Sequence, residues 1–300
     1  MTSPRQRVAI TGSSGLIGGA LSHSLREGGH DVVHLVRREP GAGHERAWDP
    51  DAATLDPSVL ADVDTVVHLA GAGVGDHRWT DEYKATIRAS RVNGTDLVSR
   101  VIAEGAGPTR LVTASAVGIY GDRGDEVLTE DSVGANTFLA GVVRDWEGAT
   151  IPATDAGIPV AHARTGIVLS TRGGALTPML RLGRLGLGGP LGSGNQWMPW
   201  ITLADTVAAY TTLIEDPSIT GPVNFTAPHP VRQRVLARTL GRRLNRPAVL
   251  PAPRAALYLA LGEFAGDVLA SARVLPHRLA RTGFEHAHPY LDDALDHLLD

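Results

Sequence analysis

The chain has 300 residues, of which 43% are hydrophobic and 20% charged, a composition typical of a folded globular protein with one large or two smaller domains. Its formal net charge of −4 argues against a nucleic-acid-binding protein, which usually carries a basic excess. The absence of cysteine excludes thiol nucleophiles, disulfides and cysteine-ligated metals. Lys84, the only lysine, is followed by Ala85, which excludes the lysine motif of a P-loop.

Targeting and membrane segments are not indicated by the sequence. The residues before Val8 are few, polar and basic, and the apolar run that follows is too short for a signal peptide. No stretch approaches the roughly 18 apolar residues of a membrane-spanning helix. We therefore expect a cytoplasmic location and no membrane partner.

The N-terminal half alternates between two kinds of pattern. Short apolar runs predict strands at residues 8–11, 31–36, 64–71, 109–115 and 159–170, and amphipathic stretches predict helices at 19–27 and 82–104. Strands that alternate with helices predict an α/β fold, with a doubly wound parallel sheet covered on both faces. The glycine-rich run at 183–194 predicts a surface loop.

The turn after the first strand carries the strongest cofactor signal. Three glycines are spaced as in dinucleotide-binding turns: the first permits the tight turn, the second lets the backbone approach a pyrophosphate, and the third lets the helix pack closely. The amides at the helix start then face the anion. The alternative is a glycine turn without a ligand. The predicted binding residues are Gly12, Ser13, Ser14, Gly15, Leu16, Ile17 and Gly18.

The end of the second strand indicates which dinucleotide binds. A site for NAD usually places an acidic residue there to bind the ribose 2′-hydroxyl. Here Arg37 and Arg38 follow the strand, and a guanidinium suits a 2′-phosphate. We therefore predict NADP(H) as the cofactor. The alternative is that both arginines are solvated turn residues.

Two further strand ends would lie at the same edge of the sheet, where ligands bind in open α/β folds. The first is followed by a segment of small residues suited to the cofactor, namely His68, Leu69, Ala70 and Gly71. We expect the His68 side chain to be structural. The second ends at Ser115 and leads to Tyr120, so both hydroxyls are predicted to lie at the mouth of the crevice and are the candidate catalytic groups.

These segments resemble the extended short-chain dehydrogenase/reductases of the epimerase/dehydratase group. Residues 90–91, 164–169, 184–194, 200–201, 224–230 and 275–279 are similar to one atypical branch, which has an NADP-binding Rossmann domain and a small C-terminal domain of unknown function. The resemblance covers nearly the whole chain. It implies an extended Rossmann fold, and it implies that Arg91 and Arg164 lie close to the cofactor.

The chain departs from the wider superfamily at the usual acid/base pair. By the resemblance, a Tyr-x-x-x-Lys motif should follow Ser115 by some twenty-five residues, but Phe138 and Val142 stand at those places. The usual mechanism therefore does not carry over. Tyr120 could replace the missing tyrosine if a cation such as Arg91 or Arg164 lowered its pKa. The alternatives are that Tyr120 packs in the pocket wall and that Ser115 bonds to backbone.

Several other candidates have structural interpretations. Asp122 could carry a proton, but we expect it to cap a turn. Thr202 and Asp205 stand at the spacing of a helix capping box. The tryptophans at 197 and 200 could wall the substrate site or pack in a core. The histidines at 286 and 288 and the acidic residues of the last helix are expected to be solvated, and we predict no metal site.

The domain and function predictions follow from these features. We assign residues 1–170 and 196–226 to the NADP-binding Rossmann domain, and residues 171–195 and 227–300 to a mostly helical substrate or cap region. We predict an NADP(H)-dependent oxidoreductase or epimerase-like enzyme that acts on a small molecule, either a small carbonyl compound or, as the resemblance implies, a nucleotide sugar. An NADP(H)-binding redox sensor without turnover and an interaction module without a cofactor stay open, as does the oligomeric state.

Overall fold

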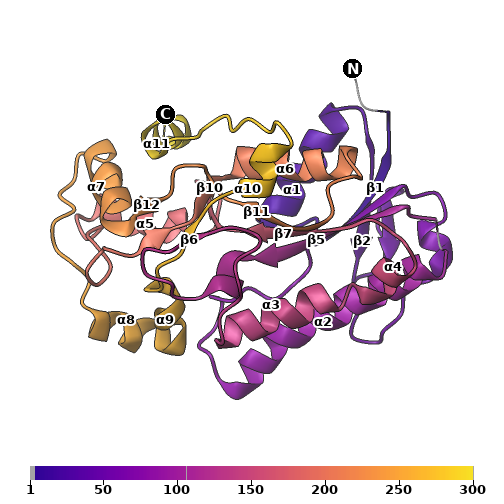
Figure 1. Cartoon of the computed structure of the whole chain (residues 1–300), viewed down its shortest axis with the longest axis horizontal. Coiled ribbons are helices and arrows are strands. Elements are labelled where there is room, and N and C mark those ends of the chain that lie inside the picture. The colour runs from indigo at the N-terminus through magenta and orange to yellow at the C-terminus, as the bar shows by residue number, and fades with distance from the viewer. Residues whose placement is uncertain (1–3, 106, 300) are drawn as a thin grey trace.

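The computed structural model describes residues 4–105 and 107–299, and its centre is a seven-stranded parallel sheet (Figure 1). The strand order is β11-β7-β5-β4-β1-β2-β3. The strands are β1 (Arg7–Thr11), β2 (Asp31–Val36), β3 (Glu45–Ala47), β4 (Thr65–His68), β5 (Arg110–Ala116), β7 (Val160–Thr165) and β11 (Gly221–Phe225). The order reverses direction between β1 and β4, so the predicted doubly wound Rossmann-type sheet is confirmed.

Helices cover both faces of this sheet. One face holds α1 (Leu16–Glu27), α6 (Leu203–Glu215) and α10 (His277–Arg281); the other holds α2 (Asp81–Ala103), α3 (Phe138–Gly148) and α4 (Ile151–Asp155). Successive side chains of a strand point to opposite faces. Val8 and Ile10 accordingly join the core under α1 and α6, whereas Ala9 joins the core under α2. Burial on both faces explains why the central strands β1 and β4 are largely apolar.

Several elements beyond the β11 edge build a second core (Figure 1). This core joins Leu180, Trp200, Leu236 and Leu295, among others. Short strand pairs are β6 (Val127–Leu128) with β13 (Arg273–Val274), β8 (Ile167–Leu169) with β10 (Trp200–Thr202), and β9 (Trp197–Met198) with β12 (Val231–Arg232). The helices here are α5 (Leu176–Arg184), α7 (Gln233–Arg243), α8 (Arg254–Leu261), α9 (Ala265–Val268) and α11 (Leu291–Leu299). Short 3₁₀ turns are Pro57–Leu60, Val117–Tyr120 and Gly262–Phe264.

The structure corrects some predicted boundaries. The strand expected at 159–170 is two strands, β7 and β8, because a side chain at Gly166 would collide with the carbonyl oxygen of Pro199. The chain leaves the central sheet at that point to pair with β10. The strand expected at 64–71 ends at His68. Within the described residues, no helix combines the length and apolar character needed to cross a membrane.

The loop predicted at 183–194 is confirmed from residue 185, where Leu185 is 73% exposed, but its first two residues form the end of α5. Its glycines also let it pack tightly, because a side chain at Gly189 would collide with the carbonyl group of Leu250.

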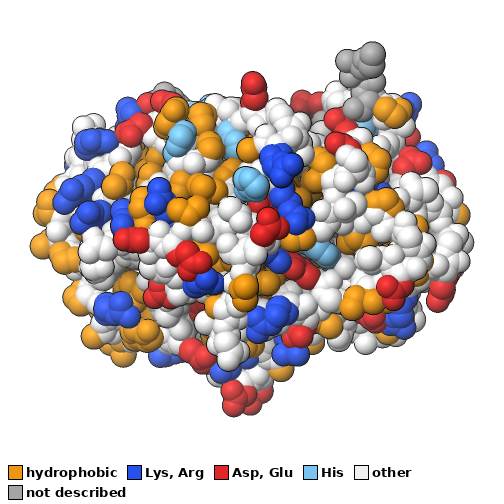
Figure 2. Space-filling model, viewed as in Figure 1, with side chains coloured by type: hydrophobic (Ala, Val, Ile, Leu, Met, Phe, Trp, Pro, Cys, Tyr) orange, Lys and Arg blue, Asp and Glu red, His pale blue; other side chains and the backbone are white. Residues whose placement is uncertain are grey.

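The second core includes Trp200, which the sequence analysis assigned to the Rossmann domain. The proposed domain division stays a prediction. On the face seen in Figure 2, basic and acidic side chains are intermixed.

Candidate active site

The glycine turn between β1 and α1 forms a tight cradle of backbone atoms. Gly12 has φ of +67°, and the Gly15 amide donates to its carbonyl oxygen over 3.0 Å. A Cβ on Gly18 would collide with that same oxygen. The helix cap, Gly15, makes no side-chain bond to the first amides of α1. This geometry fits the pyrophosphate of a dinucleotide.

Thr11 ties this turn to the exit of β4. Its hydroxyl oxygen accepts the amides of Leu69 (3.0 Å) and Ala70 (3.2 Å) and lies 2.9 Å from His68 Nδ1. The His68 side chain is fully buried edge-on against Trp48, and burial lowers its pKa to about 4. His68 is therefore neutral and structural, and only its backbone is placed to approach a ligand.

The two arginines after β2 differ in their surroundings. Arg37 is exposed and makes no hydrogen bond or ion pair with any residue that the structure describes. Arg38 forms a bidentate ion pair with Glu45 on β3, with one N–O distance of 2.9 Å. The Gly41 amide also donates to Glu45, and the bonds from Arg38 and Gly41 lower the pKa of Glu45 to about 2. Arg37 is thus free to meet a phosphate, whereas Arg38 already has a counter-ion.

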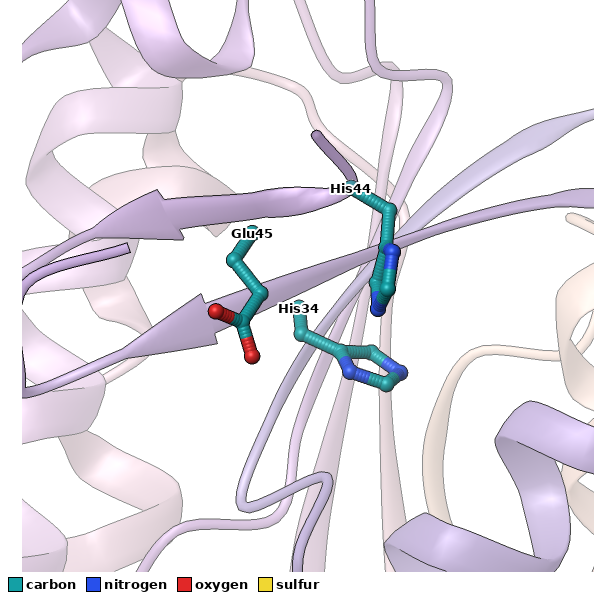
Figure 3. A group of neighbouring side chains, drawn as sticks. All are labelled: His34, His44 and Glu45. Carbon is teal, nitrogen blue, oxygen red and sulfur yellow. The ribbon is translucent and has the colours of Figure 1, made fainter. Parts of the chain in front are cut away.

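Glu45 also belongs to a group with His34 and His44, in which one ligand-type atom from each residue lies within 4.8 Å of the others (Figure 3). Both carboxylate oxygens of Glu45 are occupied by Arg38 and a backbone amide. His34 Nε2 lies 3.1 Å from Ser22 Oγ and 3.2 Å from an Arg26 nitrogen. The Glu45 carboxylate is already ion-paired, and the positive charge of Arg26 lies beside His34. The group is therefore an ion-paired cluster that does not favour binding of a cation.

Arg91 lies on α2 beside the exit of β4. A Cβ on Gly71 would contact its side chain at 3.4 Å, and its guanidinium lies over the Trp146 ring at 5.1 Å. One nitrogen donates to the Ile87 carbonyl oxygen over 3.0 Å. Burial lowers the pKa of Arg91, and no carboxylate pairs with it among residues 4–105 and 107–299. A guanidinium in this state can bind an anionic or polyhydroxy ligand.

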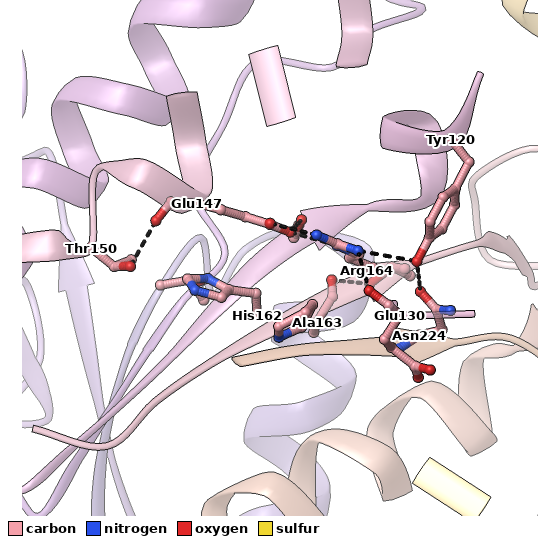
Figure 4. Close-up of polar contacts among 12 residues, drawn as sticks. Tyr120, Glu130, Glu147, Thr150, His162, Ala163, Arg164 and Asn224 are labelled. Atoms are coloured by element: carbon pink, nitrogen blue, oxygen red, sulfur yellow. Dashed lines mark hydrogen bonds and ion pairs between the residues drawn. The ribbon is translucent and has the colours of Figure 1, made fainter. Parts of the chain in front are cut away.

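A buried polar network joins the carboxyl ends of β5 and β7 (Figure 4). Ser115 Oγ donates to Glu147 on α3 over 2.6 Å, and Arg164 binds both Glu147 oxygens at 2.8 Å. Although burial raises the pKa of Glu147, the bonds and charge of Arg164 outweigh it and hold the pKa below its ordinary value. The proton of Ser115 is therefore directed to a carboxylate, which leaves its oxygen as a hydrogen-bond acceptor.

The same network holds Tyr120. Its hydroxyl accepts from Arg164 (3.1 Å) and donates to Asn224 Oδ1 (2.8 Å), and the side chain is fully buried. Burial raises the pKa of Tyr120 and outweighs the effect of Arg164. The Glu130 carboxylate accepts hydrogen bonds from the backbone amides of Asn224 and Arg278, which links the network to the C-terminal region. This arrangement favours the packing interpretation of Tyr120 over the acid/base interpretation.

The place of the missing acid/base pair is filled by apolar contacts. Phe138 packs against Trp79, with ring centroids 5.1 Å apart, and Trp79 packs against Phe264 at 5.4 Å. Val142 is 2% exposed. Lys84 is bound to Glu263 over 2.9 Å, which raises its pKa and keeps it charged. The C-terminal region therefore reaches the loop after β4, and the only lysine is an ion-pair partner.

The other sequence candidates have structural roles. The Asp122 carboxylate accepts the amides of Gly124 and Ser271, so it caps the turn. The expected helix cap is confirmed, since Thr202 accepts the Asp205 amide over 3.0 Å, but the Asp205 carboxylate accepts the Thr202 hydroxyl where a capping box would bind the Thr202 backbone amide. Trp200 is core. Trp197 lies between the guanidinium groups of Arg232 and Arg273. Asp205 accepts the amides of Ala287 and His288, His286 lies 3.0 Å from the Thr226 carbonyl oxygen, and Asp292 and Asp296 pair with arginines of α7.

Sequence reasoning missed Glu147, the carboxylate at the centre of the network. No pattern singled it out, because its partners Ser115 and Arg164 are distant in sequence. Its position five residues after Val142, on the helix that should carry the acid/base pair, was the available signal. Glu130 was missed for the same reason. A cavity of about 290 Å³, lined among others by Asp125, Asn195 and Arg254, was also not predicted.

The chain belongs to the NAD dependent epimerase/dehydratase family. That family's model matches residues 8–138, and a domain of unknown function, DUF1731, matches residues 252–298. An epimerase family protein of Mycobacterium bovis is 44% identical over 289 residues, with 96% of each chain covered. These findings confirm the resemblance to the branch with a C-terminal domain of unknown function.

Two solved structures extend the comparison. The human epimerase family protein SDR39U1, solved with NADPH, is 31% identical with a TM-score of 0.90, covering 98% of this chain and 99% of that one. A nucleoside-diphosphate sugar epimerase of Corynebacterium glutamicum is 39% identical with a TM-score of 0.83 and covers 99% of this chain. This chain spans 58% of the length of that protein.

These comparisons do not concern the location of this chain in the cell, so the expected cytoplasmic location stays a prediction.

Proposed function

We propose that this chain is an NADP(H)-dependent oxidoreductase or epimerase-like enzyme that works without the usual Tyr-x-x-x-Lys pair. The observation that carries the proposal is the glycine cradle, with Arg37 exposed and unpaired among the described residues at the end of the neighbouring strand. The human relative solved with NADPH supports the phosphorylated cofactor. We infer a small-molecule substrate, either a carbonyl compound or a nucleotide sugar.

The cofactor contacts follow from the site. The turn at residues 12–18 would hold the pyrophosphate, the backbone of residues 68–71 would line the adenosine side, and Arg37 and Arg38 would meet the 2′-phosphate. Arg91 would meet the ribose or phosphate near Gly71. We assign Arg164 a positioning role, because its nitrogens already bind Glu147, Tyr120 and the Glu130 carbonyl oxygen.

The nicotinamide supplies hydride chemistry when it is bound, and the chain must manage the proton. Ser115 would accept a hydrogen bond from a substrate hydroxyl, because its own proton goes to Glu147. As the substrate proton passes to Ser115 Oγ, the Ser115 proton would pass to Glu147, with Arg164 holding the carboxylate in place. Tyr120 would fix Arg164 from the other side. In this proposal, these residues manage the proton that the Tyr-x-x-x-Lys pair manages in the wider superfamily.

A redox sensor is the second candidate. The observation that favours it is the apolar packing of Phe138 and Val142 where acid/base groups would stand. A sensor would bind oxidised and reduced cofactor with different affinity and would not turn over. An enzyme would oxidise NADPH in the presence of a carbonyl compound.

The test is a titration of the purified chain with NADPH, NADP, NADH and NAD, followed by nicotinamide fluorescence and thermal shift. We expect the phosphorylated pair to bind more tightly. Arg37→Gln should weaken that preference, whereas Arg100→Gln, which removes an exposed arginine paired with Asp96 on α2, should not. Absent or equal binding of all four cofactors would refute the proposal. An unchanged preference of the Arg37→Gln variant for NADPH would refute the assignment of Arg37.

A further inference from the structure

The two arginines at the end of β2 are not equivalent phosphate ligands. Arg37 is exposed and has no hydrogen-bond or ion-pair partner in the part of the chain that the structure describes. Arg38 is held by Glu45, whose two oxygens each receive one of its nitrogens. A guanidinium that already has a bidentate counter-ion must leave it before it can bind a second anion in the same way.

Glu45 is well fixed as that counter-ion. It lies on β3, where the parallel ladder pairs it with His34 on β2. Its side chain is 10% exposed, while that of Arg38 is 62% exposed. The Gly41 amide donates to it over 2.8 Å. The carboxylate therefore stays in place, and the flexible, solvent-facing arginine is the partner able to move.

We propose that Glu45 is a specificity-determining residue, which competes with the cofactor 2′-phosphate for Arg38. This inference rests on the proposed NADP(H) binding. Arg37 binds the 2′-phosphate without rearrangement, and Arg38 adds its contact only by exchanging Glu45 for the phosphate. Glu45 thus holds the affinity for phosphorylated cofactor below what two free arginines would give.

Removal of the Glu45 charge has a defined expected effect. A hydrogen bond between charged groups contributes on the order of tenfold in affinity. Glu45→Gln should therefore strengthen binding of a 2′-phosphorylated ligand by about tenfold. It should leave an otherwise identical ligand without the 2′-phosphate unchanged, because Arg38 has no anion to meet there.

The probes are 2′,5′-ADP and 5′-ADP, which differ by the 2′-phosphate alone, titrated by calorimetry into the full chain. The variants are Glu45→Gln, Arg38→Gln and the double variant. Glu39→Gln is the matched control, because it removes an exposed carboxylate next to Arg38, which binds Glu39 only through the backbone carbonyl oxygen that the substitution keeps. Thermal shift checks that each variant is folded. Glu45→Asp, which shortens the carboxylate by one methylene, provides a second route if Glu45→Gln unfolds.

We expect Glu45→Gln to bind 2′,5′-ADP more tightly, Glu39→Gln to match the natural chain, and the gain to vanish in the double variant. The inference is overturned if Glu45→Gln matches Glu39→Gln, if the gain survives without Arg38, or if 5′-ADP gains equally. If the natural chain prefers 2′,5′-ADP and Glu45→Gln changes nothing, only this inference fails. If the natural chain shows no preference for 2′,5′-ADP, the proposed function fails with it.

Discussion

The buried ion pair between Glu147 and Arg164 gives the sharpest stability prediction. Glu147 accepts one hydrogen bond from Ser115 and two from Arg164, and its side chain is 15% exposed against 9% for Arg164. In Glu147→Gln the amide NH₂ would face a guanidinium N–H, so one of the two arginine bonds is lost. The arginine charge is then buried without its counter-ion.

Breaking a buried pair from one side costs about 3 to 5 kcal/mol, and the residual exposure favours the lower value. We therefore expect Glu147→Gln to lower the free energy of unfolding by about 3 kcal/mol and the melting midpoint by about 6 °C for a chain of this size. The measurement is urea and thermal unfolding. Asp145→Asn is the matched control, because Asp145 lies on the same helix and pairs with Arg88 at the surface, with exposures of 36% and 57%. That variant should cost at most about 1 kcal/mol.

The pH dependence of this difference has a definite sign. The pKa of Glu147 is held below its ordinary value of 4.5, so the pair stabilises the fold fully above that pH. The stabilisation is lost as pH falls and the folded chain protonates Glu147. The gap between the natural chain and Glu147→Gln should therefore be constant near neutrality and narrow below about pH 4.5. Equal costs for Glu147→Gln and Asp145→Asn would refute the reasoning.

Three further predictions follow from the site. Gly18→Ala should weaken NADPH binding at least tenfold by titration, because its Cβ would collide with the Gly12 carbonyl oxygen. Gly19→Ala should not, because its Cβ would lie 3.5 Å from the Ser13 carbonyl oxygen, an ordinary contact distance. His68 is buried neutral with a pKa of about 4, so the fold should lose up to about 3 kcal/mol as pH falls from 6.5 toward 4, and His68→Gln should flatten that part of the unfolding profile. Asp205→Ala removes the acceptor of two backbone amides just before α11 and should cost about 2 kcal/mol; proteolysis near that segment should rise, and an unchanged cleavage pattern would contradict the assignment.

Much of the fold was predictable because its signals are local. The apolar run of β2 and the glycine turn of residues 12–18 are recognisable without knowing what packs on them. β11 was not predicted, because Gly221 and Pro222 depress strand propensity and only the pairing with β7 makes the segment a strand. The break between β7 and β8 was missed for a similar reason, since it depends on the close approach of Pro199 to Gly166.

In the candidate site too, the parts with local sequence signals were predictable and the parts that depend on long-range contacts were not. The cradle residues are contiguous, so their chemistry follows from spacing. The network of Ser115, Glu147, Arg164 and Asn224 is assembled from β5, α3, β7 and β11, and no spacing rule joins them. The sequence could place Ser115 and Arg164 at strand ends. It could not show that both bind the carboxylate of Glu147.

That carboxylate changes how the missing acid/base pair is understood. In this chain the first two turns of α3 hold Phe138, which packs against Trp79, and the buried Val142, and the charge appears one turn later, at Glu147. A lysine at position 142 would place a cation on a side chain that is only 2% exposed. With Glu147 engaged by Arg164, that cation would have no carboxylate of its own. Restoring the family lysine alone should therefore destabilise this chain and not create the usual mechanism, because the polar centre of the site is built around Ser115 and Glu147.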